Sequence, residues 1–536
     1  MPGDPDSPRA TGVAPQALSL APVAQLERQT VARLRSRLES CDYHVDEVVA
    51  RLGSPAHTAL GRNQSLPGER ALDGADDPLA TLTRLWLLQR PAPVAAVERA
   101  LGEVMAPLCA ANLLARDGDE IRALVDIRPY DGDDGVRGWI VADLTPGMDG
   151  RIDRVADDFV LGVSPASTTL TQLATRNTIG TAFDLGTGCG VQSLHLARHA
   201  ERVVATDVNQ RALVLAGMTL ALNEVTNVEL RHGSLYEPVA DLRFDQVISN
   251  PPYVMSPPGA AHLTYREQGL PGDQLVREVV AGAARRLNPG GTAQVLANWA
   301  HPVDGDWAER LTTWVSDTGC DLHVVQREVL DPAEYVELWL ADAGLQNTPG
   351  YRRAYAAWLD HFAAIGVAAV GMGWIFLANS GRAIPEMTVE HWPHPVAQPV
   401  GPDIARWPER SRLAHLPEGE LLAMHLVVAP DLTQMTTGRP GEPDPQRIEL
   451  RQHQGLCRVV QCDTALAGAI GACDGELTLG VILDAVARLL DRDPAELRAA
   501  VLPEVRDLLR NGMLTVLSKG DDPLEPPIRA ERPMAR

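Results

Sequence analysis

A glycine-rich turn between two short apolar segments constrains the fold of this chain more than any other feature. Residues 181–185 (TAFDL) predict a buried strand, and residues 186–190 (GTGCG) follow it as a tight turn. An apolar-periodic segment at 191–199 predicts a helix, and residues 202–206 (RVVAT) predict a second strand. A strand, a crossover helix and a second strand form a parallel pair, so the centre of the chain belongs to the α/β class.

The residues around this turn indicate which ligand it binds. Asp207 ends the second strand about 20 residues past the glycines, where a carboxylate can accept hydrogen bonds from two ribose hydroxyls. Asp184 stands directly before the turn, where an anion suits a cationic amino group better than a pyrophosphate. Gly186, Gly188 and Gly190 have the spacing Gly-x-Gly-x-Gly, whereas dinucleotide-binding turns have Gly-x-Gly-x-x-Gly. Together these features favour S-adenosylmethionine.

The second informative motif is Asn250-Pro251-Pro252-Tyr253, which follows an apolar strand predicted at 244–249. The prolines end the strand and place Asn250 at its carboxyl end, where open α/β sheets bind ligands. The side-chain oxygen of Asn250 and the carbonyl of Pro251 can both accept hydrogen bonds from one planar NH2 group, and Tyr253 offers it a flat face. Taken alone, the motif could be an ordinary turn. In this context it predicts methylation of an amide or exocyclic-amine nitrogen.

Residues from about 184 to 257 resemble class I S-adenosylmethionine-dependent methyltransferases of the Asn-Pro-Pro-Tyr group. That group includes release-factor glutamine, adenine-N6 DNA and ribosomal-RNA guanine-N2 methyltransferases. Residues 233–238 (GSLYEP) resemble a stretch that lies at the adenine side of the cofactor in small-domain members, many of which have Asp where this chain has Ser234. The whole chain resembles a multi-domain actinobacterial family. The resemblance implies Asn250, Pro251 and Tyr253 as catalytic residues, and cofactor contacts from Asp184, Gly186, Thr187, Gly188, Gly190, Asp207, Ser234 and Leu235.

Three residues have alternative interpretations. In related enzymes, the segment equivalent to 161–169 (LGVSPASTT) covers the methionine end of the cofactor, so Ser167 or Thr169 could bond its carboxylate. These two residues could equally be the N-cap of a helix that starts near 170. Asp207 could likewise cap the helix that starts near 210.

The chain has 536 residues, which suggests about three domains. The catalytic part is expected to be a Rossmann-like, doubly wound and mostly parallel sheet, flanked by two mainly helical, winged-helix-like domains. The predicted divisions are a disordered tail (1–22), the N-terminal domain (23–150), the methyltransferase domain (151–385), a linker (386–412), the C-terminal domain (413–518) and a second disordered tail (519–536).

The two flanking domains are predicted from helices that are followed by strands. In the N-terminal domain, residues 101–150 hold ten acidic residues and four arginines, which favours protein docking or substrate capping over DNA reading. A first helix is expected to start there near residue 23, and further helices are expected at 45–52, 81–88 and 93–105. A polar loop is expected at 61–77. In the C-terminal domain, we expect helices at 464–472, 479–490 and 494–510, a turn at 473–475 and a strand at 513–517.

The sequence after the Asn-Pro-Pro-Tyr motif continues the sheet. A mobile loop is expected at 269–273, and 367–377 is expected as the last antiparallel strand. The other expected elements are a helix ending at 287, strands at 292–297 and 322–329, and helices at 307–318, 334–342 and 352–365.

Composition excludes several function classes. The chain has 70 acidic and 48 basic residues, a net charge of −22, which disfavours nucleic acid as a partner. Lys519 is the only lysine, so there is no P-loop lysine. No long apolar run or signal sequence is present, which predicts a cytoplasmic protein without a membrane partner. The seven cysteines are scattered, and the spacing of His453, Cys457, Cys462 and Cys473 matches no common zinc site, so we expect no disulfide and no metal.

Three functions therefore remain open, and all imply a macromolecular partner, either nucleic acid or protein. The first, and the main expectation, is an N-methyltransferase acting on a nucleobase in RNA or DNA. The second is the same chemistry on a protein glutamine. The third is a non-catalytic regulator with a vestigial methyltransferase domain. The oligomeric state is not predicted.

Overall fold

The computed structural model describes residue 23 and residues 25–150, 155–258, 270–346, 348–440 and 445–516. The chain divides into two compact units, Met1–Pro393 and His394–Arg536, each of which is described by itself. The predictions for the tails at 1–22 and 519–536 lie outside the described residues.

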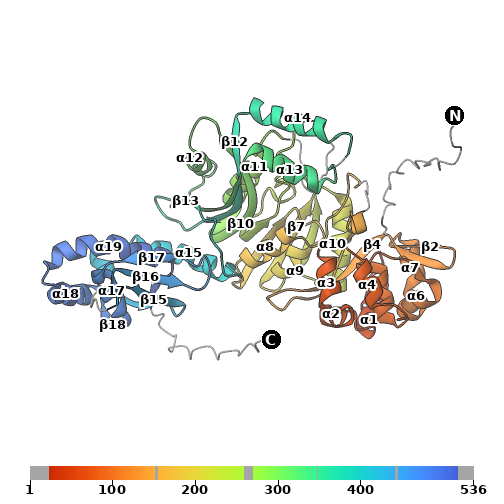
Figure 1. Ribbon diagram of the computed structural model, residues 1–536, viewed down its shortest axis with the longest axis horizontal. Helices are drawn as coiled ribbons and strands as arrows, with labels where there is room; N and C mark the ends of the chain where they lie inside the picture. Colours follow the sequence, from red (N-terminus) through yellow and green to blue (C-terminus); the bar gives the residue numbers. More distant parts are fainter. Residues whose placement is uncertain are drawn as a thin grey trace, which may run out of the picture. The chain divides into compact units, whose positions relative to one another are not determined.

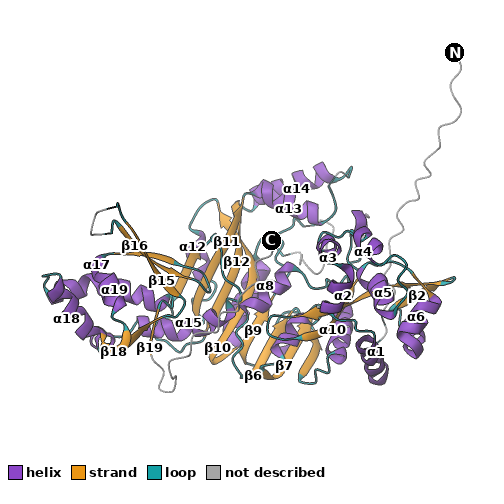
Figure 2. Cartoon of the chain, turned by 60° about the horizontal axis from the view of Figure 1, so that its bottom comes forward, coloured by secondary structure: helices purple, strands orange, loops and turns teal. Residues whose placement is uncertain are grey.

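The first unit is built on an eight-stranded sheet with the order β13-β11-β12-β10-β9-β6-β7-β8. The five strands from β10 to β8 run parallel to one another, while β12 is antiparallel to both β10 and β11. Figure 2 shows several of these strands side by side. The expected α/β fold is therefore confirmed as a mixed sheet. The strands are β6 (Ile179–Leu185), β7 (Ala200–Asp207), β8 (Val228–His232), β9 (Phe244–Ser249), β10 (Leu287–Pro302), β11 (Asp321–Leu330), β12 (Val367–Ala378) and β13 (Met387–His391).

Helices follow the parallel strands and cover the sheet. One core lies between α11 and the sheet, where Phe183 stacks on Phe244 with ring centroids 4.9 Å apart. Towards the other edge, α10 packs on β7 and β8. An added helical pair, α13 and α14, follows β11 and packs on β12 (Figure 1). The helices are α8 (Pro165–Leu173), α9 (Val191–Leu196), α10 (Gln210–Leu222), α11 (Gln274–Arg286), α12 (Trp307–Thr312), α13 (Pro332–Asp342) and α14 (Tyr351–Ala364).

The N-terminal part of this unit is mainly helical, as expected, and it ends in two small sheets. The polar loop predicted at 61–77 is wrong, because residues 66–71 form a short helix whose buried Gly68 faces Leu88. The winged-helix assignment stays a prediction. The helices are α1 (Arg28–Ser40), α2 (Val45–Leu52), α3 (Ser54–Leu60), α4 (Leu66–Ala71), α5 (Pro78–Leu82), α6 (Val94–Leu101) and α7 (Met105–Ala110), and the strands are β1 (Ala92–Pro93), β2 (Leu114–Asp117), β3 (Glu120–Ala123), β4 (Val125–Asp131) and β5 (Arg137–Asp143).

The linker predicted at 386–412 is too long: the boundary between the two units falls within it, after Pro393, but residues at both of its ends belong to regular elements. Strand β13 extends the sheet by pairing in parallel with β11, and residues 401–414 form a helix of the second unit. The reason is tertiary: β11 would otherwise leave a row of backbone groups unpaired at the sheet edge.

The second unit contains the three C-terminal helices and the closing strand that the sequence predicts. The turn expected at 473–475 is wrong from 474 onward, because strand β18 begins there and pairs with β14. The winged-helix assignment again stays a prediction. The elements are α15 (Gly401–Ala414), α16 (Glu418–Leu422), β14 (His425–Val428), β15 (Leu432–Thr437), β16 (Arg447–Gln452), β17 (Val459–Cys462), α17 (Thr464–Gly471), β18 (Asp474–Thr478), α18 (Leu479–Leu489), α19 (Pro494–Arg510) and β19 (Leu514–Val516).

Candidate active site

The candidate site lies where the strand order of the sheet reverses. The chain runs outward from β6 to β7 and β8, and it then returns to place β9 on the other side of β6. Ligands bind in the crevice that such a reversal leaves at the carboxyl ends of the strands. Leu185 and Ser249 are register partners there, and Ser249 Oγ donates a hydrogen bond to the Leu185 carbonyl at 2.8 Å. The glycine turn and Asn250, which follow these two residues, are therefore neighbours.

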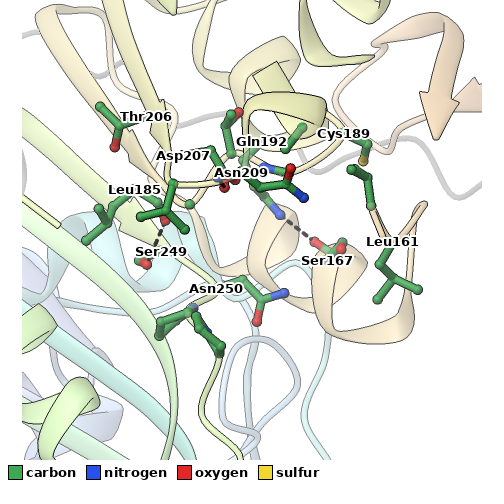
Figure 3. Close-up of a pocket in the computed structure, with 18 of the residues that line it drawn as sticks. Leu161, Ser167, Leu185, Cys189, Gln192, Thr206, Asp207, Asn209, Ser249 and Asn250 are labelled. Atoms are coloured by element: carbon green, nitrogen blue, oxygen red, sulfur yellow. Dashed lines mark hydrogen bonds between the residues drawn. The ribbon is translucent and has the colours of Figure 1, made fainter. Parts of the chain in front are cut away.

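An open cavity of about 140 Å³ lies at this position. Figure 3 shows Asn250 on one side of it and Gln192, Asp207 and Asn209 on the other. Of the predicted site residues, the cavity is lined by Ser167, Gly186, Thr187, Gly188, Asp207, Leu235, Asn250 and Pro251, but not by Thr169, Asp184, Gly190, Ser234 or Tyr253.

The glycine turn has a left-handed backbone that explains its composition. Gly186 and Gly190 have φ angles of 78° and 83°, which residues with a Cβ atom rarely adopt. The Gly186 and Thr187 amides both donate to the Thr206 carbonyl at 2.9 Å, which ties the turn to β7. Gly190 lies behind the cavity, where a Cβ atom would be 3.2 Å from Ala216 of α10.

Asp184 holds the turn from behind. Its carboxylate is 1 % exposed and accepts hydrogen bonds from Thr187 Oγ1 at 2.7 Å and Ser193 Oγ at 2.6 Å. Burial raises the pKa of Asp184 to about 6. In this geometry the residue joins the turn to α9, and a direct contact with an amino group of the cofactor stays a prediction.

Asp207 presents a carboxylate at the cavity. Its Oδ2 accepts from the Gly188 amide at 2.9 Å, and its Oδ1 accepts from the Asn209 amide at 2.8 Å. Burial raises the pKa of this carboxyl group. The alternative of Asp207 as an N-cap is wrong, because Asn209 caps α10 and accepts from the Arg211 amide. Each Asp207 oxygen keeps acceptor capacity for a ligand hydroxyl.

Asn250 has an acceptor atom that nothing in the described residues satisfies. Its Oδ1 is closed off from solvent and has no hydrogen-bond partner among them. Pro251 and Pro252 line the same cavity. Tyr253 turns away from it, and its ring meets Trp339 edge-on at 6.2 Å. Burial raises the pKa of Tyr253, and stacking of its ring on a substrate stays a prediction.

Two further cavity-lining residues, Gln192 and Thr206, also have a buried oxygen without a partner in the described residues. The sequence did not predict either of them as a site residue. Gln192 Nε2 donates to the Ser167 carbonyl at 2.9 Å, which leaves Gln192 Oε1 buried without a partner in the described residues. Thr206 Oγ1 is in the same state. Buried polar atoms without partners are rare in native structures, so three around one cavity indicate a polar ligand. The only sequence signal was position, since Gln192 is the second residue of the helix after the turn and Thr206 directly precedes Asp207 at the end of β7.

The segment 161–169 runs along the cavity through Leu161, Gly162 and Ser167. The helix that follows begins at Pro165, and its N-cap is Ser164, whose side chain accepts from the Ser167 amide. Ser167 and Thr169 are therefore not the cap of a helix that starts near 170, and that alternative is wrong.

Potential metal ligands do not cluster in the described part of the chain. This part contains no group of three or more His, Cys, Asp or Glu side chains that could hold a metal ion, and all seven cysteines are free. Within the same ranges, no helix combines the length and apolar character that crossing a bilayer requires.

Two known sequence families match parts of the chain. Residues 40–124 match a domain of unknown function, and residues 162–313 match the family described as methyltransferase small domain. The second match covers the glycine turn, Asp207 and the Asn-Pro-Pro-Tyr motif.

Curated relatives match over the same central part. A release factor glutamine methyltransferase from Gloeobacter violaceus is 35 % identical over 149 residues, which are 26 % of this chain and 51 % of the relative. A ribosomal RNA small subunit methyltransferase C from Escherichia coli is 31 % identical over 140 residues, which are 26 % of this chain and 36 % of the relative. The chain thus spans about half or less of the length of these relatives.

Solved structures of methyltransferases also align with this chain. An rRNA methylase from Streptococcus thermophilus is 16 % identical with a TM-score of 0.22, and it covers 41 % of this chain and 98 % of its own. A methyltransferase from Pyrococcus furiosus is 16 % identical with a TM-score of 0.25, and it covers 41 % and 85 %. Likeness at this level carries no argument about this chain. Residues 162–313 are thus similar to the methyltransferase small domain family and to these relatives.

Proposed function

We propose that the protein is an S-adenosylmethionine-dependent N-methyltransferase that acts on a planar amide or exocyclic-amine nitrogen of a macromolecule. The observation that carries this proposal is the buried Oδ1 of Asn250 beside the glycine turn, which has no partner in the described part of the chain. An acceptor atom in this state needs a donor from a ligand, and an NH2 group supplies one.

The residues around the cavity fit S-adenosylmethionine. Asp207 has two oxygens with free acceptor capacity for the ribose hydroxyls. Gln192 Oε1, which has no partner among the residues that the structure describes, is an acceptor for the cationic amino group. Phe159, Leu161 and Leu235 supply apolar lining for the adenine. When bound, this cofactor supplies a methyl group that its sulfonium already makes electrophilic.

The protein's own residues then have to orient the acceptor. Asn250 Oδ1 and the Pro251 carbonyl accept hydrogen bonds from the two hydrogens of the NH2 group. This arrangement fixes the plane of the group and turns the nitrogen lone pair toward the methyl. The same two oxygens stabilise the positive charge that develops on the nitrogen during transfer.

Charge favours a protein glutamine amide as the acceptor. Residues 1–393 contain 49 Asp and Glu against 32 Arg, a net charge of −17. A polyanion such as RNA or DNA is repelled by such a unit, whereas a neutral amide in a protein segment is not. A nucleobase, which the sequence analysis placed first, presents the same planar NH2 group and is the alternative. The intact Asp207 and Asn250 disfavour the non-catalytic regulator.

Labelling separates these acceptors. Purified protein is incubated with radiolabelled S-adenosylmethionine and cell lysate, with Asn250→Ala as the control, and the product is digested separately with nuclease and protease. Loss of label only to protease supports a protein amide, and loss to nuclease makes a nucleobase the acceptor. Cofactor binding without incorporation into any macromolecule would overturn the proposed acceptor class, and absence of cofactor binding would overturn the proposal as a whole.

A further inference from the structure

The N-terminal hairpin β4–β5 lies against α10 through unusual hydrogen bonds. The Val141 amide donates to Thr219 Oγ1 at 2.9 Å. Asn223 accepts from the Trp139 amide at 3.1 Å and donates to the Trp139 carbonyl at 2.7 Å. The free edge of this two-stranded sheet is thus satisfied by helix side chains rather than by another strand.

The fit of the strand to the helix is close. At Gly138, a Cβ atom would lie 1.6 Å from Asn223 Oδ1, so the approach requires glycine. Trp139, next to it, is fully buried, and its indole Nε1 donates to the Tyr43 carbonyl at 2.8 Å. Strand β5 is therefore held between the N-terminal helices and the methyltransferase domain.

A buried ion pair ends this contact at the cavity. Asp143, the last residue of β5, accepts from Arg211 Nε with both carboxylate oxygens, at 3.0 and 3.1 Å, and both side chains are buried. Asp143 Oδ2 also accepts from the Val160 amide at 2.8 Å, while the Asp143 amide donates to the Val160 carbonyl at 3.1 Å. Val160 and its neighbours from Phe159 to Gly162 line the cavity. One carboxylate thus joins the hairpin, α10 and the cavity lining.

A second polar contact joins the same hairpin to α9. His195 is 3 % exposed, and its Nδ1 lies 2.7 Å from Asp134 Oδ2 while its Nε2 lies 2.8 Å from the Tyr130 hydroxyl. Tyr130 is the penultimate residue of β4, and Asp134 lies in the loop that leads to β5. Helix α9 starts directly after the glycine turn. Helices α9 and α10, which both contribute residues to the cavity lining, are thus held by the N-terminal hairpin.

We propose that Asp143 and Arg211 are positioning residues for cofactor binding, and that the end of strand β5 supports the cofactor site through residues 159–162. This proposal rests on the proposed function. It gives the N-terminal part a role that differs from substrate capping. The cofactor contacts residues 159–162, Asp143 holds that segment in place through the Val160 amide, and Arg211 holds Asp143.

Calorimetric titration of the full chain with S-adenosylmethionine tests this. The informative variant combines Asp143→Leu with Arg211→Met, because apolar replacement of both members of a buried ion pair is commonly neutral or stabilising. We expect a loss of thermal stability no larger than that from one unsatisfied buried amide, because the Val160 amide loses its acceptor. For the same reason, the dissociation constant should rise about tenfold. The matched control combines Asp403→Leu with Arg410→Met, the same replacement of a largely buried ion pair in the second unit, and it should leave the affinity unchanged.

Unchanged affinity in the stable double variant would overturn the proposal. Hydrogen exchange of the unmodified chain provides a measurement that no variant's folding can spoil. Cofactor binding should slow amide exchange in 137–143 and 159–162 but not in β16 of the second unit, and equal exchange with and without cofactor in these two segments would also overturn it. If the unmodified chain binds no cofactor, the proposed function itself fails, and the first titration shows this directly.

Discussion

Replacing Asn250 by Ala should separate stability from catalysis. In the unliganded protein, Oδ1 of Asn250 makes no hydrogen bond to the described residues, so its removal breaks none there. A buried acceptor without a partner costs about 1–3 kcal/mol, and its loss offsets the packing contacts of a small side chain. We therefore expect the free energy of unfolding to stay unchanged or to rise by about 1 kcal/mol. Methyl transfer should fall about 10²–10³-fold, as when one preorganised hydrogen-bonding group is lost from an active site.

The matched substitution is Asn288→Ala in the same unit. Asn288 Nδ2 donates to Asp245 Oδ1 at 2.7 Å, so this asparagine is partnered by a carboxylate. Its removal should lower the free energy of unfolding by about 1.5–3 kcal/mol. The assays are urea unfolding, titration with S-adenosylmethionine and methyl incorporation. A loss of 1 kcal/mol or more in Asn250→Ala would refute the reasoning, since it would mean that Oδ1 is already satisfied in the unliganded protein. Methyl transfer at the unmodified rate would refute the assigned role.

Three further predictions follow from the same site. Asp207→Asn should weaken binding of S-adenosylmethionine about tenfold in a calorimetric titration, because a neutral amide accepts ribose hydroxyls less strongly, and an unchanged dissociation constant would place the ribose elsewhere. Burial raises the pKa of Asp184 to about 6, so folding favours its protonated form. Its stability contribution is therefore full below the ordinary pKa near 3.8 and is lost as pH rises to about 6. In urea unfolding, the free energy of unfolding should decline between these two pH values in the unmodified protein but not in Asp184→Asn. Equal slopes of this free energy against pH in the two proteins would contradict the raised pKa of Asp184. Gly190→Ala should lower stability by about 1–2 kcal/mol, because φ is 83° and Ala216 lies against the new Cβ atom, and a melting temperature equal to that of the unmodified protein would contradict this.

The sequence predicted the parts of the fold that local pattern determines. The glycine turn, the strands on each side of it and the strand before Asn250 follow from apolar runs and from residues with special backbone needs, and the structure has them in those places. Strand β13 could not be predicted in this way. Its residues 387–391 form a strand because β11 presents an unpaired edge, which is a property of a different segment.

The candidate site shows the same limit. Asn250 and Asp207 could be placed because each ends a strand at the reversal of strand order. Asp184 could not be assigned to its partners Thr187 and Ser193 without the turn geometry. Gln192 and Thr206 were missed because an unsatisfied buried oxygen is visible only when all neighbours are known. The sequence predicts the N-terminal part as a domain of its own, because the contact that joins it to the catalytic part links Trp139 to Asn223, 84 residues further along the chain.

That separation in sequence has a consequence for synthesis of the chain. Strand β5 leaves the ribosome before Asn223, and at about 5–20 residues per second the intervening 84 residues take roughly 4–17 s. A hairpin forms in microseconds, so β4–β5 has a bare edge for most of this interval. An uncovered edge strand pairs readily with other chains. Asp131, Asp133 and Asp134 at the hairpin tip place negative charge beside that edge and disfavour such pairing between nascent chains, until α10 is made and covers it.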